Sequence, residues 1–147
     1  MKRRIWAIAL VIVMAVASLG AAASSDSEDA LMARLAGLSM EDLLEEAAEV
    51  SKEAGEPEAL IFHASALALR LDELTEKQIL SYAAEKEKPE YFRVIMLDLC
   101  GKLKEEGKLK DTAVLEEMFA DTSEIEAVRT RACYLIENPK LLEAVFW

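Results

Sequence analysis

The residues best suited to acid–base or metal chemistry are few and lie far apart in the chain. His63 is the single histidine among the 147 residues. A metal site or a catalytic relay needs several side chains that converge on one point. Neither a second histidine nor a recognisable serine or cysteine nucleophile motif accompanies His63. We therefore expect His63 to be a structural residue rather than a catalytic base or a metal ligand.

The two cysteines, Cys100 and Cys133, are the candidates for a disulfide. If the two cysteines lie on neighbouring helices of a helical repeat, which is described below, their positions along the helix axes differ by about one helical turn. The axes of packed helices are about 8–10 Å apart, whereas a disulfide requires Cα atoms within about 7 Å of each other. An oxidising compartment permits a bridge, so both outcomes stay open. The geometry favours two buried thiols that act as small hydrophobic side chains.

Acidic side chains cluster at helical spacing in one segment, at Glu41, Asp42, Glu45, Glu46 and Glu49. Carboxylates four residues apart could coordinate calcium, but no EF-hand-like loop with its central glycine is present. We therefore interpret the segment as the solvated face of a helix. The sequence also contains no glycine-rich phosphate loop and no Cys-x-x-Cys, His-Glu-x-x-His or Gly-x-Ser-x-Gly motif. We accordingly expect no enzyme activity, no cofactor and no metal.

The first 23 residues have the composition of a secretory signal peptide. Three basic residues at positions 2–4 precede an uncharged apolar run over 5–19, and small residues fill positions 21–23. This pattern predicts cleavage near Ala23/Ser24 and an extracytoplasmic location, secreted or periplasmic. The alternative is an uncleaved anchor helix, because the apolar segment is long enough to span a bilayer. Only in that case do we expect contact with a membrane.

The net charge narrows the classes of partner. The chain carries a formal charge of −11, and without the basic residues at positions 2–4 it keeps 14 basic against 28 acidic residues, a net charge of −14. Such a surface repels phosphate backbones and anionic lipid headgroups. We therefore expect a protein partner, of unspecified identity, and no nucleic acid.

Three helix-start residues recur at equal intervals of 36 residues, at Ser39, Thr75 and Asp111. The side chain of each can accept a hydrogen bond from a backbone amide in the first turn of a helix. Equal spacing of such caps indicates a stacked helical repeat. Repeat stacks bind partners through extended surfaces. Because no useful stretch alternates with the two-residue period of a strand, we predict an all-α fold.

The chain divides into three parts on this basis: the signal peptide over 1–23, a polar lead-in with a weak first helix over 24–38, and a helical repeat domain over 39–147. Short loops in the repeat domain make each helix antiparallel to the next. The segment 57–71 is apolar nearly all round, which is typical of a helix buried between its neighbours. The first predicted helices span 30–38, 40–54, 57–71, 76–87 and 89–106, the last of them stopped by Gly107. An outer helix is predicted after Asp111, and a capping box of Ser123 and Glu126 opens the inner helix that follows it. A fourth outer helix is predicted after Asn138.

The third unit resembles a known repeat family. Residues 121–135 contain an acidic turn, then Val128-Arg129, a small residue three positions on and a leucine three beyond that. This order is similar to the HEAT-repeat pattern, and residues 89–93 resemble the same turn-to-helix element. The resemblance covers about residues 39–147. It implies a right-handed α-solenoid of antiparallel helix pairs, with about three HEAT-like repeats plus a partial fourth, whose faces bind other macromolecules.

Aligning the inner helices brings His63, Arg93 and Arg129 to one position. The HEAT resemblance implies that this position lies at the interface between repeats, where an arginine pairs with an aspartate of the neighbouring repeat. His63 departs from this pattern, which weakens the expected ladder at the first unit. Arg93 and Arg129 retain it.

The last residues of the sequence form a candidate interaction edge, at Leu142, Val145, Phe146 and Trp147. No inner helix follows to cover them, so either the array continues beyond the sequence or the apolar edge packs on a partner. We therefore predict an exported, non-catalytic protein-interaction or scaffold module. The alternatives are a compact extracytoplasmic helical bundle with a structural or inhibitory role and, less favoured, the helical-repeat part of a larger enzyme.

Overall fold

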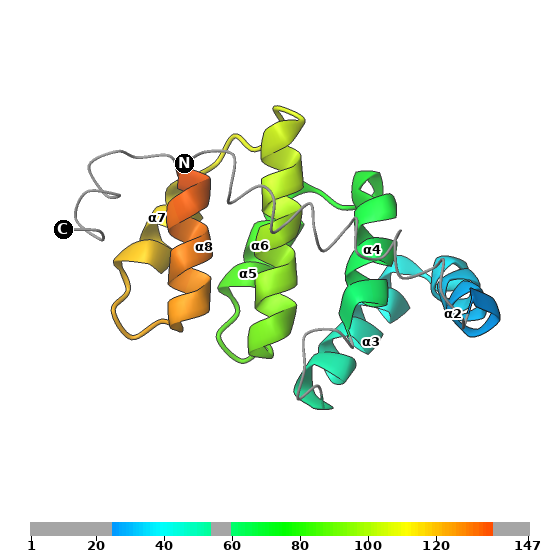
Figure 1. Cartoon of the computed structure of the whole chain (residues 1–147). Helices are drawn as coiled ribbons and strands as arrows, with labels where there is room; N and C mark the ends of the chain where they lie inside the picture. Colours follow the sequence, from blue (N-terminus) through cyan, green and yellow to red (C-terminus); the bar gives the residue numbers. More distant parts are fainter. Residues whose placement is uncertain (1–24, 54–59, 137–147) are drawn as a thin grey trace. The chain divides into compact units, whose positions relative to one another are not determined.

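The computed structural model describes residues 25–53 and 60–136, and the chain divides into two compact units, 1–71 and 72–147. Every regular element in the described ranges is helical, which confirms the predicted all-α class for this part of the chain (Figure 1). The elements are α2 (Ser25–Gly37), α3 (Met40–Glu53), α4 (Ile61–Leu69), the 3-10 turn η2 (Leu71–Glu73), α5 (Glu76–Ala84), α6 (Glu90–Glu105), α7 (Ala113–Ala120) and α8 (Glu126–Ile136).

In the first unit, α4 packs against both α2 and α3. Leu35 of α2, Leu43 of α3 and Leu67 of α4 have no exposed surface. Burying a leucine side chain stabilises a fold by about 1.5–3 kcal/mol relative to leaving it in water. These apolar contacts therefore hold the three helices together.

Helix α4 buries one face rather than its whole circumference. Its buried residues are His63, Ala66 and Leu67, which the three- and four-residue helical spacing places on one side. Leu69, at the end of the helix, is 76% exposed. The expectation that this apolar helix is buried nearly all round is therefore wrong at Leu69. The predicted start of the helix, at residue 57, lies outside the described residues.

Two of the three predicted caps start helices where expected. The Ser39 hydroxyl oxygen accepts a hydrogen bond of 3.1 Å from the Asp42 amide, at the start of α3. Thr75 and Gln78 form a full capping box at the start of α5, with each side chain accepting from the other residue's backbone amide. These bonds satisfy first-turn amides that have no acceptor inside the helix.

At the third predicted cap, Asp111, the helix begins one residue later than predicted. Asp111 accepts a hydrogen bond of 3.1 Å from the Ala113 amide, but α7 begins at Ala113, with Thr112 as the preceding cap residue. The reason lies in the loop before α7. The carboxylate of Glu76 accepts from the amides of Lys110 and Asp111 at 2.8 and 2.7 Å, which fixes this stretch in a non-helical course.

Helix α6 ends as the sequence predicts. Gly107 adopts a φ of 70°, in the left-handed region that favours glycine. The Gly107 amide donates to the Lys104 carbonyl at 3.0 Å, and the Lys108 amide donates to the Leu103 carbonyl at 2.8 Å. This pair of bonds is the Schellman arrangement, which satisfies carbonyls of the last turn.

The second unit consists of two stacked helix pairs. Helix α5 packs on α6 and α7 packs on α8, while α6 also contacts α8 and α5 contacts α7. Figure 1 shows α6 and α8 side by side in front of α5 and α7. The core runs through all four helices, because Ile79, Met96, Leu115 and Val128, one from each, have no exposed surface.

The two cysteines lie in the layer formed by α6 and α8, with Cys100 on α6 and Cys133 on α8. Both are buried free thiols, so the interpretation of them as small hydrophobic side chains fits the structure. Burial raises the pKa of Cys100 to about 12, and the nearby carboxylates of Glu76 and Asp98 act in the same direction. Burial also raises the pKa of Cys133. Both thiols are therefore poor nucleophiles.

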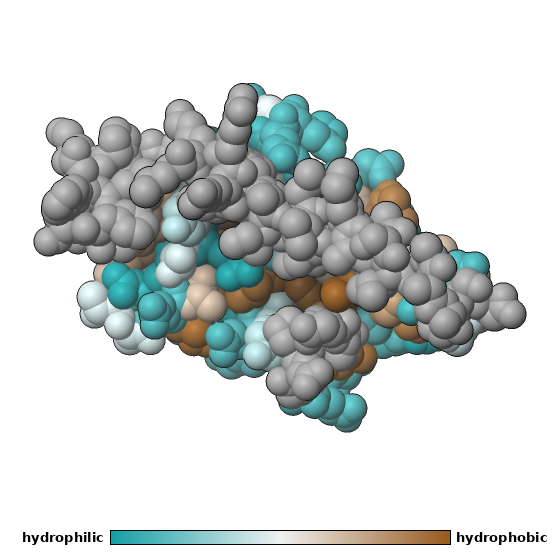
Figure 2. Space-filling model, in the orientation of Figure 1, coloured by the Kyte–Doolittle hydropathy of each residue, from teal (hydrophilic) through white to brown (hydrophobic). Residues whose placement is uncertain are grey.

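Within the described ranges, no helix combines the length and the apolar character needed to cross a membrane. The apolar segment 5–19 and the expected cleavage point at Ala23/Ser24 lie outside those ranges. On the face seen in Figure 2, hydrophilic residues are interspersed with smaller hydrophobic areas. Among the described residues, the large hydrophobic side chains with the greatest exposure are Leu69 at 76% and Ile125 at 37%.

Candidate functional site

The most unusual polar group of the described chain is a buried arginine on α6. Arg93 is 1% exposed and lies in the first turn of that helix, directly after the Pro89-Glu90 start. Its Nε donates a hydrogen bond of 2.8 Å to the carbonyl oxygen of Ala83, near the end of α5. Because Pro89 cannot continue the preceding chain as a helix, the turn between α5 and α6 brings these two residues together.

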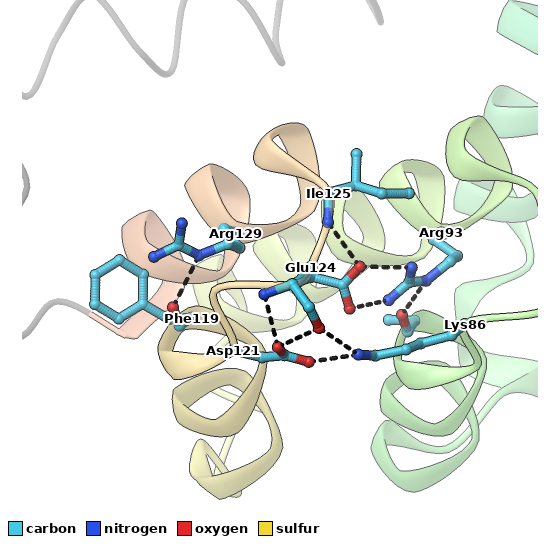
Figure 3. A network of polar contacts seen from close by, with 9 residues as sticks. Lys86, Arg93, Phe119, Asp121, Glu124, Ile125 and Arg129 are labelled. Atoms are coloured by element: carbon cyan, nitrogen blue, oxygen red, sulfur yellow. Dashed lines mark hydrogen bonds and ion pairs between the residues drawn. The ribbon is translucent and has the colours of Figure 1, made fainter.

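The terminal nitrogens of Arg93 bind Glu124, which belongs to the next helix pair. Nη1 donates to Oε1 at 2.9 Å and Nη2 donates to Oε2 at 2.6 Å, so the contact is bidentate (Figure 3). The side chains are 1% and 3% exposed. Hydrogen bonding by Arg93 holds the pKa of Glu124 below its usual range. The Ile125 amide also donates to Glu124 Oε1 at 2.9 Å, which satisfies the carboxylate further.

A second, exposed ion pair lies beside the buried one. Lys86 donates to Asp121, and it also lies 3.3 Å from the Ser123 hydroxyl oxygen. These bonds run from the turn after α5 to the turn after α7, as Figure 3 shows. The Lys86 ammonium and the Ser123 hydroxyl hold the pKa of Asp121 below its usual range.

The predicted capping box of Ser123 and Glu126 is replaced by a different arrangement. The Ser123 hydroxyl donates to Asp121 Oδ1 at 2.6 Å, and the Ser123 amide donates to the same oxygen at 2.9 Å. Helix α8 begins only at Glu126. The physical reason is that Asp121, which follows α7 directly, takes both donors of Ser123 before the next helix starts. This turn leaves Glu124 facing Arg93.

Arg129 of α8 repeats half of the Arg93 geometry. Its Nε donates to the Phe119 carbonyl at 3.1 Å, and its guanidinium carbon lies 5.7 Å from the centre of the Phe119 ring. Both arginines thus bind a carbonyl ten residues earlier, Ala83 or Phe119, in the next-to-last position of the preceding helix. The sequence alignment of Arg93 with Arg129 therefore corresponds to a repeated local structure.

His63, aligned with these arginines, makes a different contact. It is 5% exposed, and its Nε2 lies 3.0 Å from Glu46 Oε1 on α3. Arg34 of α2 also binds Glu46, with donor–acceptor distances of 2.8 and 2.5 Å. Hydrogen bonds from Arg34 and then His63 lower the pKa of Glu46 to about 2. Glu46 is therefore an exception to the predicted solvated acidic face, because it is a bonded link between helices.

The candidate edge of Leu142, Val145, Phe146 and Trp147 lies outside the described residues. The HEAT resemblance implied an aspartate as the partner of the arginine, whereas the partner of Arg93 is a glutamate, Glu124. The signal that could have found it is a carboxylate in the turn that precedes the Val-Arg element. Glu124 occupies that turn four residues before Val128.

A pocket of about 380 Å³ lies beside Arg129 and is lined by the end of α7, the turn that follows it and α8. Its lining combines charged, polar and aromatic groups: Phe119, Thr122, Glu124, Glu126, Arg129, Thr130, Cys133 and Tyr134. Across residues 25–53 and 60–136, no three His, Cys, Asp or Glu side chains are grouped to hold a metal ion.

Comparisons with protein-family models, with curated proteins and with solved structures found no match to this chain.

Proposed function

We propose that this chain is an exported, non-catalytic protein-interaction or scaffold module, built from HEAT-like helical repeats in a right-handed α-solenoid. The observation that carries the proposal is the buried Arg93–Glu124 pair between successive helix pairs. An ion pair at this position gives one helix pair a specific, directional contact with the next. Stacked units of this kind present extended surfaces to a partner.

Two further features support the proposal. The donor geometry of Arg93 recurs at Arg129, which is what a repeat unit predicts. The contacts between α5, α6, α7 and α8 join each pair to its neighbour in two layers, as stacked repeats require. The export component rests on the basic, apolar and small-residue order of positions 2–23.

Affinity capture tests the interaction component. The chain, tagged at its C-terminus and purified from the producing cell, serves as bait for an extracytoplasmic extract, with an unrelated acidic helical protein as the control bait. We expect a protein enriched by this chain alone, which then binds the purified chain saturably with a defined stoichiometry. Failure to enrich any protein that passes this second step would contradict the proposal.

Mass spectrometry of the same purified chain tests export. We expect a mature N-terminus near Ser24 and recovery from the extracytoplasmic fraction, because the pattern before Ala23 fits signal peptidase. Recovery of an intact N-terminus from the cytoplasmic fraction would refute the export component.

A further inference from the structure

Resting on the proposed function, we infer that the surface of α3 and α4 covered by α2 is a docking site for a basic amphipathic helix of a partner protein, which displaces α2. The contacts of α2 itself supply the template for this interaction. Leu35 of α2 is buried, and the adjacent Arg34 binds the Glu46 carboxylate of α3 through both terminal nitrogens. A helix that occupies this surface therefore needs a leucine next to an arginine.

Few contacts hold α2 in place. Among its residues 27–37, Leu35 is the only one that is buried. The side chains of Arg34 and Glu46 are 52% and 28% exposed, so water competes for their ion pair. A helix of 13 residues is also only marginally stable in water without packing. Separating α2 from the rest of the first unit therefore breaks little apolar contact and one weak ion pair.

Charge makes α2 a poor match for the helix that it binds. The sequence of α2 contains three acidic residues and one basic residue, a formal charge of −2, and that of α3 contains six acidic residues and one basic residue, a formal charge of −5. Asp42, Glu49 and Glu53 lie on the same side of α3 as Glu46, because they are three, four or seven residues away from it. Lys52 binds Glu49 at 2.6 Å and offsets part of this charge. A basic helix is attracted where the acidic α2 is repelled.

The polar cluster around Glu46 is also incompletely satisfied while α2 is in place. The Nε2 of His63 lies 3.0 Å from Glu46 Oε1. The pKa of Glu46 is about 2, so the carboxylate is ionised and accepts the Nε2 proton. Among the described residues, no group binds the buried Nδ1 of the same ring, which is an acceptor when the ring is neutral. Lysine and arginine side chains are donors only, so a basic helix carries the complementary groups.

A second copy of this chain is not the partner that this surface favours. Its α2 has the same sequence as the resident α2, which residues 38–39 tether to α3 at a roughly millimolar effective concentration. The copy therefore adds no new contact and lacks the advantage of the tether. Phosphate groups are repelled by the carboxylates of α3. A different protein with a positively charged helix overcomes the tether through its attraction to α3.

Two synthetic peptides test the docking site. The first has the sequence of α2, residues 25–37. The second carries Asp29→Lys, Ala33→Lys and Ala36→Lys, which change exposed positions and raise the formal charge from −2 to +2. Each peptide carries a fluorescent label and is titrated with the whole chain while its anisotropy is recorded. We expect saturable binding of the basic peptide with a Kd of about 1 mM or lower, and binding of the acidic peptide that is at least about tenfold weaker.

Variants of the chain distinguish displacement of α2 from binding elsewhere. Leu35→Ser in the chain weakens the resident α2 and increases the fraction of molecules whose docking site is free, so the basic peptide should bind about tenfold more tightly. Ala30→Ser, at an exposed position of α2, should leave the Kd within about twofold. Arg34→Gln removes the ion pair without changing the apolar core and should strengthen binding severalfold. Circular dichroism confirms that each variant remains helical before it is titrated.

A further set of variants locates the peptide on the surface. Leu35→Ser in the basic peptide should weaken binding at least about tenfold, because the buried leucine is lost. In the Leu35→Ser chain, Glu46→Gln should weaken binding of the basic peptide severalfold, because the peptide arginine loses its carboxylate. The matched change Glu41→Gln, at an exposed position on a different side of α3, should leave the Kd within about twofold.

Four results would overturn the docking site. They are the absence of saturable binding of the basic peptide to both the original chain and the Leu35→Ser chain, equal affinity of these two chains for it, equal affinity of the original chain for the two peptides, and self-association of the chain that Leu35→Ser abolishes. The last result identifies a second copy as the occupant. A protein that the original chain captures and that a saturating amount of the basic peptide fails to displace would overturn the docking site and leave the proposed function standing.

Discussion

The two units each hold a glutamate with an arginine, but at very different depths. In the first unit, the side chains of Arg34 and Glu46 are 52% and 28% exposed. In the second, those of Arg93 and Glu124 are 1% and 3% exposed. Both contacts are bidentate, with comparable distances. The number of hydrogen bonds therefore does not distinguish the two sites, and access to water does.

This difference in depth changes what each contact does for the fold. Water competes for an exposed pair, so its contribution to stability is small. A buried pair is costly to desolvate, and removing one partner leaves an uncompensated charge in the interior. We therefore expect the second unit to depend on Arg93 and Glu124 together, while the first unit depends mainly on its apolar core.

The largest effect should follow from Arg93→Gln. The glutamine is neutral and too short to reach Glu124 in a bidentate manner, so the Glu124 carboxylate stays buried without its cation. The free energy of unfolding should fall by about 3–5 kcal/mol, as measured by denaturant titration of the second unit's transition.

Arg131→Gln is the control for this experiment, because it removes the same charge from a pair that is 35% and 38% exposed. It should change the free energy of unfolding by no more than about 1 kcal/mol. Similar losses of unfolding free energy for the two variants would show that burial does not determine how much such a pair stabilises the fold.

Acidification should have the second-largest effect on stability. The pKa of Glu124 is lowered in the fold by Arg93, so its pair stabilises the fold fully above the unfolded-state pKa, about 4.3. That contribution is lost as the pH falls through the lower folded-state value. The loss from Glu46 should extend from about 4.3 down to about 2.

Unfolding midpoints recorded between neutral and acidic pH check this expectation. Glu124→Gln should flatten the acid slope of the original chain, whereas Glu126→Gln, at the exposed first residue of α8, should leave it nearly unchanged. An identical acid slope in the original chain and in Glu124→Gln would show that the buried carboxylate does not govern acid stability.

The smallest effect should come from Glu46→Gln in the first unit. The amide oxygen can still accept one bond from Arg34, and solvent can replace the other. The buried His63 also lies against Oε1 of Glu46, so a small loss of stability remains. We expect a loss of stability several times smaller than that of Arg93→Gln, and a loss of equal size would contradict the ranking of the two units.

Much of the local structure could be predicted from side chains that act on their own backbone. Ser39 and Thr75 begin helices because their side chains accept hydrogen bonds from backbone amides a few residues away. Gly107 ends a helix because it adopts the left-handed backbone conformation. Asp111 shows the limit of such reasoning. The distant Glu76 carboxylate binds the same stretch of backbone, and no local pattern reports that contact.

The candidate site was predictable in part for the same reason. The alignment of the inner helices identified Arg93 and Arg129 as equivalent, because it needs only the pattern of residues along the sequence. The partner of Arg93, Glu124, is 31 residues away in the sequence. Glu124 faces Arg93 because Asp121 binds Ser123 and keeps it outside α8. Glu46 was assigned to solvent because its bonds to Arg34 and His63 come from other helices.

If the contact between Arg93 and Glu124 joins the stacked helix pairs, the two side chains stabilise the fold only together. A double-mutant cycle with Arg93→Met, Glu124→Leu and the combined variant measures this directly from denaturant unfolding. We predict a coupling free energy of at least about 2 kcal/mol, with the double variant more stable than either single one. Additive losses, with a coupling below about 0.5 kcal/mol, would contradict the claim.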